Sequence, residues 1–112
     1  MFEKNLEIGY LLDFYGEILP PRRRDIMDLY YNDDLSLAEI AEQLGITRQA
    51  VRDSIKKTET ELFFYEEKLG LRRRFTEATD HAEAALSLCR QSDADPALEE
   101  CLTDLLRAVS GD

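Results

Sequence analysis

The short connection between two helical segments constrains this chain more than any other feature. Ser36, with Glu39 three residues later, has the spacing of a capping box, which starts a helix. Apolar residues then recur at helical intervals, and Gly45 supplies the left-handed backbone that commonly ends helices. Because Thr47 has the character of an N-cap for the next helix, only two residues lie between the segments. We expect a helix over residues 36–44 and a second helix that crosses it steeply.

A connection this short between crossing helices is the geometry of a helix-turn-helix, which we place at about residues 36–57. Proteins with this motif insert the start of the second helix into the major groove of DNA, where outward side chains meet base edges and phosphates. Val51 and Ile55 are expected to face the core, so Arg48 and Arg52 would face outward. The side chains expected to contact nucleic acid from this helix are Thr47, Arg48, Gln49, Arg52, Lys56 and Lys57. The alternative is a solvated helix face in a protein that keeps the motif only for packing.

The second helix of the motif meets no glycine or proline until Gly70, so it can run for about twenty residues. Ile55, Leu62 and Leu69 are spaced at sevens along it, which is a short heptad-like pattern. Such a pattern can pack on the C-terminal helices of the same chain or on a second copy. We predict a homodimer whose interface contains Ile55, Leu62, Phe63, Tyr65 and Leu69.

Two further helices are expected before the motif, over residues 3–15 and 21–31, separated by two consecutive prolines. Ile18 and Leu19 continue the apolar spacing of the first helix. The first turn of the second helix carries three consecutive arginines, where positive charge is unfavourable to the helix dipole. These arginines form either a solvated helix start or a set of phosphate contacts. We include Arg22, Arg23 and Arg24 in the predicted nucleic-acid interface.

The net charge of −10 is concentrated in the last third of the chain. Residues 1–74 contain twelve Lys/Arg and fifteen Asp/Glu, whereas residues 75–112 contain two and nine. A basic stretch remains at residues 47–58, which hold four cations and one acid. Local basic patches of this kind attract phosphates even on an acidic protein, so the net charge does not exclude nucleic-acid binding.

The acidic part of the chain has the pattern of a helical hairpin, with Asp95 and Pro96 as the N-cap and first residue of its second helix. Residues 72–74 are three arginines that follow a glycine, and we expect them at a helix end, where positive charge is favourable. We therefore divide the chain into a helix-turn-helix domain, residues 1–75, and an acidic C-terminal helical hairpin or tail, residues 76–112.

The inventory of reactive side chains argues against an enzyme. His81 is the single histidine and no glycine-rich phosphate loop is present, while Cys89 and Cys101 offer neither a zinc ligand set nor a disulfide framework. We expect both cysteines to be reduced and buried. No apolar run reaches the roughly 18 residues that span a bilayer, and no basic leader is seen. We expect a cytoplasmic protein with no catalytic site, metal, cofactor, membrane contact or small-molecule substrate.

Residues 36–55 resemble region 4 of bacterial sigma factors, which reads the upstream promoter element. Over about its first 75 residues, the chain resembles the YlxM family of bacterial proteins, the UPF0122 type. The residues that carry this resemblance are Met1 and residues 11–16, 29–31, 33–36, 39–42, 45–53 and 62–69. The expected fold is all-α, with a sigma-factor-like helix-turn-helix, a long recognition helix and additional C-terminal helices. The YlxM resemblance also implies a homodimer and a role in the signal recognition particle pathway.

Two functions stay open. The charge of the second motif helix favours a regulatory protein that binds DNA or the RNA of the signal recognition particle. The acidic tail favours a dimeric scaffold that modulates the particle's GTPases without touching nucleic acid, because the tail would repel a duplex unless it faced away. The two are compatible in a dimer with paired basic helices on one side and acidic tails on the other.

Overall fold

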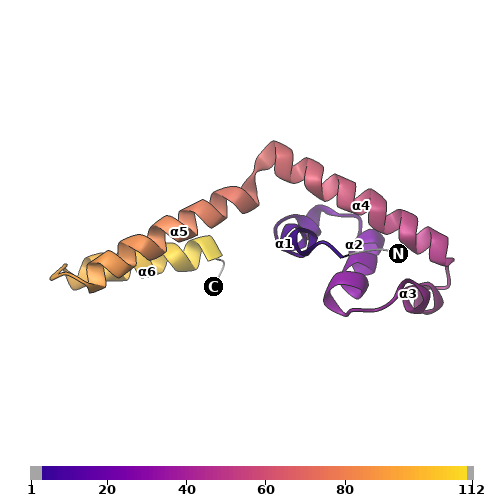
Figure 1. The fold of residues 1–112 in the computed structure, drawn as a ribbon, viewed down its shortest axis with the longest axis horizontal. Helices are drawn as coiled ribbons and strands as arrows, with labels where there is room; N and C mark the ends of the chain where they lie inside the picture. Colours follow the sequence, from indigo (N-terminus) through magenta and orange to yellow (C-terminus); the bar gives the residue numbers. More distant parts are fainter. Residues whose placement is uncertain (1–3, 111–112) are drawn as a thin grey trace. The chain divides into compact units, whose positions relative to one another are not determined.

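The computed structural model describes residues 4–110, and over these residues the protein is helical without a β strand (Figure 1). The α helices are α1 (Leu6–Tyr15), α2 (Pro21–Met27), α3 (Leu37–Leu44), α4 (Arg48–Leu69), α5 (Leu71–Arg90) and α6 (Pro96–Ser110). The expected all-α class is confirmed. Met1 and the expected helix start at Glu3 lie outside the described residues.

Two compact units follow each other along the chain. Unit 1 ends at Gly70 and contains α1 to α4, and unit 2 begins at Leu71 and contains α5 and α6. Gly70 ends α4 in the left-handed conformation, at φ 62°, and its N–H donates to the carbonyl of Glu66 at 2.8 Å. The expected boundary between residues 75 and 76 falls inside α5, because this helix begins directly after the glycine.

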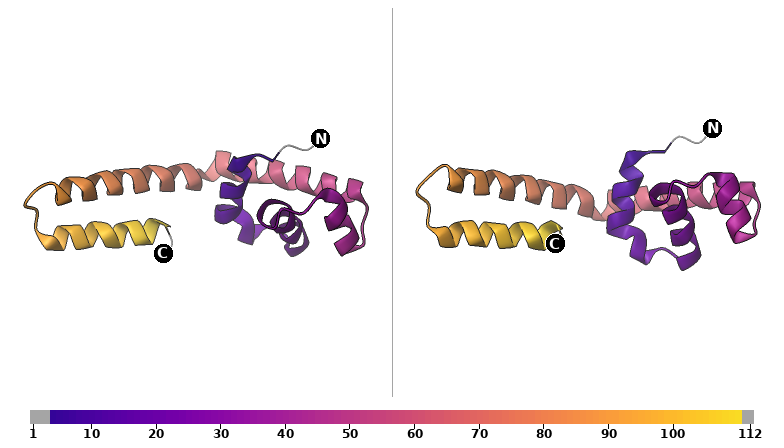
Figure 2. Two further views of the ribbon diagram at one scale, coloured as in Figure 1. Left: turned by 60° about the horizontal axis from the view of Figure 1, so that its bottom comes forward. Right: turned by 90° about the horizontal axis from the view of Figure 1, so that it is seen from below.

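Unit 1 is built around α4, which packs against α1, α2 and α3. Figure 1 shows these three helices on one side of α4, and the two views of Figure 2 agree. The fully buried apolar side chains of unit 1 come from all four helices and include Ile8, Leu11, Met27, Ile40, Val51, Ile55 and Leu62. Each such burial contributes roughly 1.5–3 kcal/mol relative to exposure, so this shared core holds the four helices together.

Helix α1 ends at Tyr15, as expected, whereas the second expected helix is α-helical over only part of its range. A 3-10 turn, η1 (Gly16–Ile18), follows α1 and leaves Ile18 59% exposed, while Leu19 directly after it is buried. Because a 3-10 turn has about 3.0 residues per turn instead of 3.6, these two residues do not both continue the buried stripe of α1. The helix expected over residues 21–31 is α-helical only as far as Met27 and continues as a π turn, η2 (Asp28–Asn32).

Helix α3 starts with the capping box that the sequence predicts. Ser36 Oγ accepts from the N–H of Glu39 at 3.1 Å, and the Glu39 carboxylate accepts from the N–H of Ser36 at 3.0 Å. This backbone hydrogen bond holds the pKa of Glu39 below its usual range. At the other end of α3, Gly45 adopts the left-handed conformation, at φ 69°. Both local signals are confirmed.

Replacing Gly45 by alanine should lower the free energy of unfolding by about 1–2 kcal/mol, the cost of placing an L residue in the left-handed region. A Cβ at this position would meet nothing within 4 Å, so the effect comes from the backbone alone. Gly9→Ala is the control, because Gly9 lies inside α1 and a Cβ there would also meet nothing within 4 Å. Alanine at this position should raise the free energy of unfolding by about 0.5–1 kcal/mol. Urea denaturation measures the free energy of unfolding of both variants. A Gly45→Ala variant as stable as the parent would contradict the strain argument.

Unit 2 is a helical hairpin, as expected, in which α5 packs against α6. The Asp95 carboxylate accepts from a backbone N–H of α6 at 2.9 Å, which confirms this residue as the N-cap. Ala82 and Leu86 are the buried apolar side chains of the described part of the hairpin. Both cysteines are free, but Cys89 is only half-buried and Cys101 is exposed, contrary to the prediction. A pair of helices covers only one side of each helix, which explains this difference.

The three arginines at residues 72–74 lie in the first turn of α5 and not at the C-terminal end of a helix as predicted. The prediction is wrong because a single residue, Gly70, separates the end of α4 from the start of α5. Positive charge at this end of a helix is unfavourable to its dipole. Arg72 Nη1 donates to Thr76 Oγ1 at 3.4 Å, within the same helix.

Candidate nucleic-acid interface

The helix-turn-helix places the start of α4 at the surface of unit 1. The N–H of Ile46 donates to the carbonyl of Ala41 at 3.1 Å and closes the turn. Thr47 Oγ1 accepts from the N–H of Ala50 at 3.0 Å, which makes it the N-cap of α4 as predicted. Val51 is fully buried in the core, so the opposite side of this helical turn faces the solvent.

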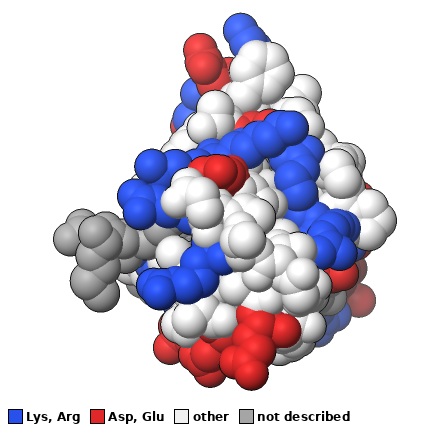
Figure 3. Space-filling model, turned by 90° about the vertical axis from the view of Figure 1, so that its right-hand side faces the viewer, with Lys and Arg blue, Asp and Glu red and all other residues white. Residues whose placement is uncertain are grey.

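The predicted contact residues at the start of α4 share the side that faces solvent. Thr47, Arg48, Gln49, Arg52, Lys56 and Lys57 are all exposed. Arg48, Arg52 and Lys56 are each four residues apart, so they form a row along the helix, which we call the α4 basic row. Figure 3 looks at unit 1 from the side where α3 and the start of α4 lie, and it shows Lys and Arg in a band across this face, with some Asp and Glu among them and a larger acidic group at the lower edge.

Gln49 adds hydrogen-bonding capacity beside the α4 basic row. Its Nε2 donates to the Asp53 carboxylate at 2.8 Å, which holds the amide along the helix and leaves the amide oxygen able to accept. Base amino groups in the major groove are donors for such an oxygen, while guanidinium groups suit guanine and phosphate oxygens. The start of α4 therefore offers both donors and an acceptor to a nucleic acid.

Ala50 lies on the same helical turn but is absent from the predicted contacts. Its side chain is exposed, and it lies three residues after the N-cap Thr47 and directly before the buried Val51. A methyl group at this position is small enough to let the helix approach a duplex and can contact the methyl group of thymine. Its place on the first turn of the motif's second helix is the signal that could have found it.

The three arginines of α2 do not act alike. Arg22 and Arg24 are exposed, as a phosphate contact requires. The side chain of Arg23 is only 19% exposed, and its Nη1 lies 2.8 Å from the Glu61 carboxylate and 3.4 Å from Thr58 Oγ1. Arg23 therefore ties α2 to α4, contrary to the predicted role. Consecutive helical residues point about 100° apart, and Arg23 is the one of the three whose side chain is directed toward α4.

The heptad-like pattern of α4 faces the core of unit 1 along most of its length. Ile55 and Leu62 are each 0% exposed, because α4 packs on the first three helices. These two side chains are covered by their own chain and are not open to a second copy, contrary to the predicted dimer interface. Heptad spacing indicates a buried stripe but does not say which partner buries it. Of the other predicted positions, Tyr65 is half-buried, and Phe63 and Leu69 are 44% and 50% exposed.

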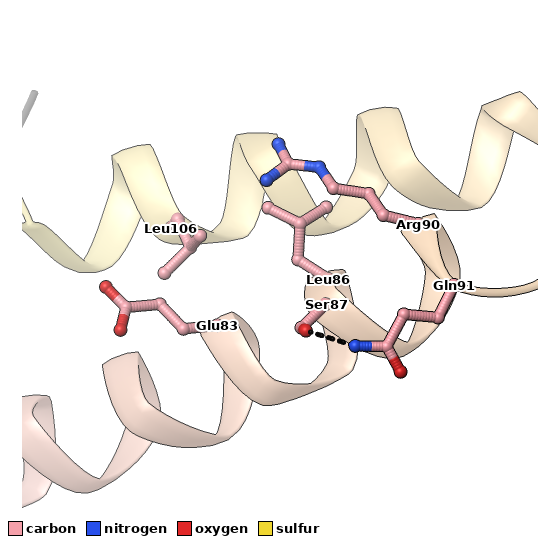
Figure 4. A pocket seen from close by; sticks show the side chains of 6 residues that line it. All are labelled: Glu83, Leu86, Ser87, Arg90, Gln91 and Leu106. Atoms are coloured by element: carbon pink, nitrogen blue, oxygen red, sulfur yellow. Dashed lines mark hydrogen bonds between the residues drawn. The ribbon is translucent and has the colours of Figure 1, made fainter.

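A hollow of about 460 Å³ lies in unit 2 (Figure 4). Its lining residues are Glu83, Leu86, Ser87, Arg90, Gln91 and Leu106. Figure 4 shows Leu86 and Leu106 pointing from the two helices into the space between them. Gln91 Nε2 donates to Ser87 Oγ at 3.3 Å, and Arg90 Nε lies 3.1 Å from the Glu99 carboxylate beside it. These six side chains do not form a hydrogen-bonded pair of a nucleophile and a general base. The hollow is a gap between the two helices of the hairpin.

Residues 4–110 contain neither a candidate metal site nor a candidate membrane-spanning helix. Within this range no three His, Cys, Asp or Glu side chains are placed to hold a metal ion together. None of its helices combines the length and apolar character needed to cross a membrane. The lack of a metal, cofactor or catalytic site stays a prediction.

Known proteins with similar sequences identify the family of this chain. Residues 2–102 match the model of a family described as "Putative helix-turn-helix protein, YlxM / p13 like". The chain belongs to this family. The UPF0122 protein of Geobacillus kaustophilus is 55% identical over 75 residues, which cover 67% of this chain and 68% of that protein. The UPF0122 protein of Exiguobacterium is 55% identical over 73 residues (65% and 68%), and that of Bacillus cereus AH187 is 53% identical over 77 residues (69% and 70%).

Family membership confirms the resemblance that the sequence carries. The match to the YlxM-like family reaches residue 102, so it extends past the first 75 residues and includes α5 and part of α6. The family is described by its helix-turn-helix and not by a reaction.

Proposed function

We propose that this protein is a nucleic-acid-binding regulatory protein that uses α4 as its recognition helix. The observation that carries the proposal is the α4 basic row, whose three cations are exposed on one side of a helix while Val51 and Ile55 are buried on the other. This is the arrangement in which a helix-turn-helix presents its second helix to a duplex. The exposed Arg22 and Arg24 supply further phosphate contacts. The resemblance to YlxM proteins supports a cytoplasmic role in the signal recognition particle pathway.

The net charge of −10 does not oppose this function at physiological salt. The Debye length is then about 8 Å, so distant acidic residues are largely screened from a bound duplex. Phosphates at the start of α4 would instead experience the nearby cations. Asp53 is the one acid of residues 47–58, and it is already engaged by Gln49.

The shape of the site favours duplex DNA over duplex RNA. The major groove of B-form DNA is about 12 Å wide and admits an α helix, whereas the deep and narrow major groove of A-form RNA does not. The RNA of the signal recognition particle would have to bind through phosphates or unpaired bases. We therefore propose DNA as the first ligand to test and this RNA as the second.

A fluorescence-anisotropy titration of a DNA duplex and of the particle RNA across a salt series tests this function. Three to five phosphate contacts should release enough counterions to lower the affinity roughly 40- to 500-fold between about 50 and 200 mM salt. The ligand that binds more tightly identifies the class of nucleic acid. Absence of binding to both at the lowest salt would reject the proposal.

A second candidate function is a protein-interaction module that modulates the GTPases of the signal recognition particle. The observation that favours it is the acidity of residues 75–112, which hold nine Asp/Glu and two Lys/Arg. If neither nucleic acid binds, pull-downs with these GTPases become the decisive measurement. We also propose a homodimer, which the resemblance to YlxM proteins implies, since two copies would present two α4 basic rows to a two-fold symmetric site.

A further inference from the structure

Helix α6 carries an apolar row that its own unit does not cover. Leu98, Cys101, Leu105 and Ala108 are all exposed, with Leu98 at 49% and Leu105 at 47%. Their spacing of three, four and three residues places them on one side of the helix over about three turns, and we call this set the α6 stripe. The side of α6 that faces α5 is a different one, since it carries Leu106, which lines the hollow with Leu86.

The hairpin of unit 2 is too thin to bury its own apolar surface. Ala82 and Leu86 are its buried apolar side chains among the residues described. Chains of about 40 residues or fewer usually need an oligomeric partner, a metal or disulfides to be stable. A third helix laid along the α6 stripe would complete a small bundle with α5 and α6.

Charge indicates what kind of helix fits there. Residues 91–104 contain five Asp/Glu and no Lys/Arg. Glu100 and Asp104 are exposed on α6, and Asp104 lies one turn from both Cys101 and Ala108, at the edge of the stripe. The Asp104 carboxylate lies 3.7 Å from Arg107 Nη1, and exposed ion pairs of this kind contribute little to stability. A second copy would bring the same acids to this edge and be repelled, whereas Lys or Arg beside an apolar stripe would be attracted.

We propose that the α6 stripe binds a basic amphipathic helix of another protein. Leucine-like side chains of the partner would pack on Leu98 and Leu105, and its flanking cations would face Glu100 and Asp104. Helices recognised in this way present anchors at i, i+3, i+4 and i+7, and the stripe, at i, i+3, i+7 and i+10, follows the same helical period. This surface lies on unit 2 and is independent of the nucleic-acid site on α4, so it extends the proposed function to a second ligand.

The test uses the full chain and a fluorescent model peptide of about 18 residues with leucine at heptad positions a and d and lysine elsewhere. A matched peptide carries glutamate in place of lysine. The lysine peptide should bind at least about tenfold more tightly than the glutamate peptide, because only its charge complements that of unit 2. The double variant Leu98→Asn/Leu105→Asn should lower the affinity for the lysine peptide by at least about tenfold, because both leucines of the stripe are lost. The variant Leu88→Asn is the control, since Leu88 is 66% exposed on α5, outside the stripe, and it should leave the affinity within about twofold.

Several results would overturn the proposal. Equal affinity of the parent and the Leu98→Asn/Leu105→Asn variant for the lysine peptide would show attraction by charge alone. Equal binding of the two peptides would remove the argument from charge. Sedimentation equilibrium that shows a parent dimer and a monomeric double variant would assign the stripe to a second copy. Circular dichroism confirms that each variant stays helical, and DNA titrations of the same variants separate a failure here from a failure of the α4 site.

Discussion

Replacing Arg48, Arg52 and Lys56 together by alanine should weaken nucleic-acid binding by roughly 100- to 1,000-fold at about 100 mM salt. Charge-assisted hydrogen bonds contribute about 1.5–3 kcal/mol each, and three partly additive losses give this range. The slope of log K against log salt should also become shallower by about 2.7, since each lost phosphate contact removes about 0.9. Anisotropy titrations of the parent and the variant across the same salt series measure both effects.

A charge-matched variant separates the α4 basic row from general electrostatics. Lys68, Arg73 and Arg74 are exposed and lie far along the chain from the start of α4, so replacing them by alanine removes the same three charges. This control should retain most of the parent's affinity. Equal losses in the two triple variants would mean that only net charge matters. If neither variant loses affinity, the helix-turn-helix is a packing unit and the protein-interaction function gains support.

Leu62→Ala should lower the free energy of unfolding of unit 1 by about 2–5 kcal/mol, the range for leucine removed from a packed core. Leu62 is 0% exposed where α4 packs against the other helices of unit 1. The loss combines the transfer energy of the deleted atoms with the cavity they leave. Chemical denaturation followed by circular dichroism, with the two units fitted as separate transitions where they separate, gives the value.

Leu69→Ala is the matched control for this substitution. Leu69 has the same side chain, lies seven residues further along the same helix and is 50% exposed. Its replacement should cost less than about 1 kcal/mol, as is usual for surface positions. A heptad-like dimer interface along α4 would predict similar costs at the two positions and a dependence of stability on protein concentration. Similar losses with such a dependence would restore the interface expected from the sequence.

The starts and ends of the helices in the motif were predictable because each depends on a few neighbouring residues. The capping box of Ser36 and Glu39, the left-handed Gly45 and the N-cap Thr47 are hydrogen bonds or backbone conformations within one helical turn. Gly70 ends α4 for the same local reason. The exposed position of the α4 basic row also followed from periodicity, since Val51 and Ile55 mark the buried side.

Tertiary packing decided which members of a pattern are open to a partner. Among three adjacent arginines, only Arg23 meets Glu61, a residue of another helix far along the chain. The heptad-like pattern of α4 left open whether a second copy or the chain's own helices would cover Leu62, and the first three helices cover it. Cys101 is exposed because the hairpin offers α6 a single neighbour on one side.

The sequence by itself determined the helical class, the motif and the ends of its helices, because these depend on contacts between residues three or four apart. The tertiary structure alone decided the partial burial of Arg23, the cover over Leu62 and the exposure of the α6 stripe. Periodicity states that a helix has an apolar side. Which neighbour covers that side depends on segments that only folding brings together, and this is why the surfaces proposed for binding needed the structure.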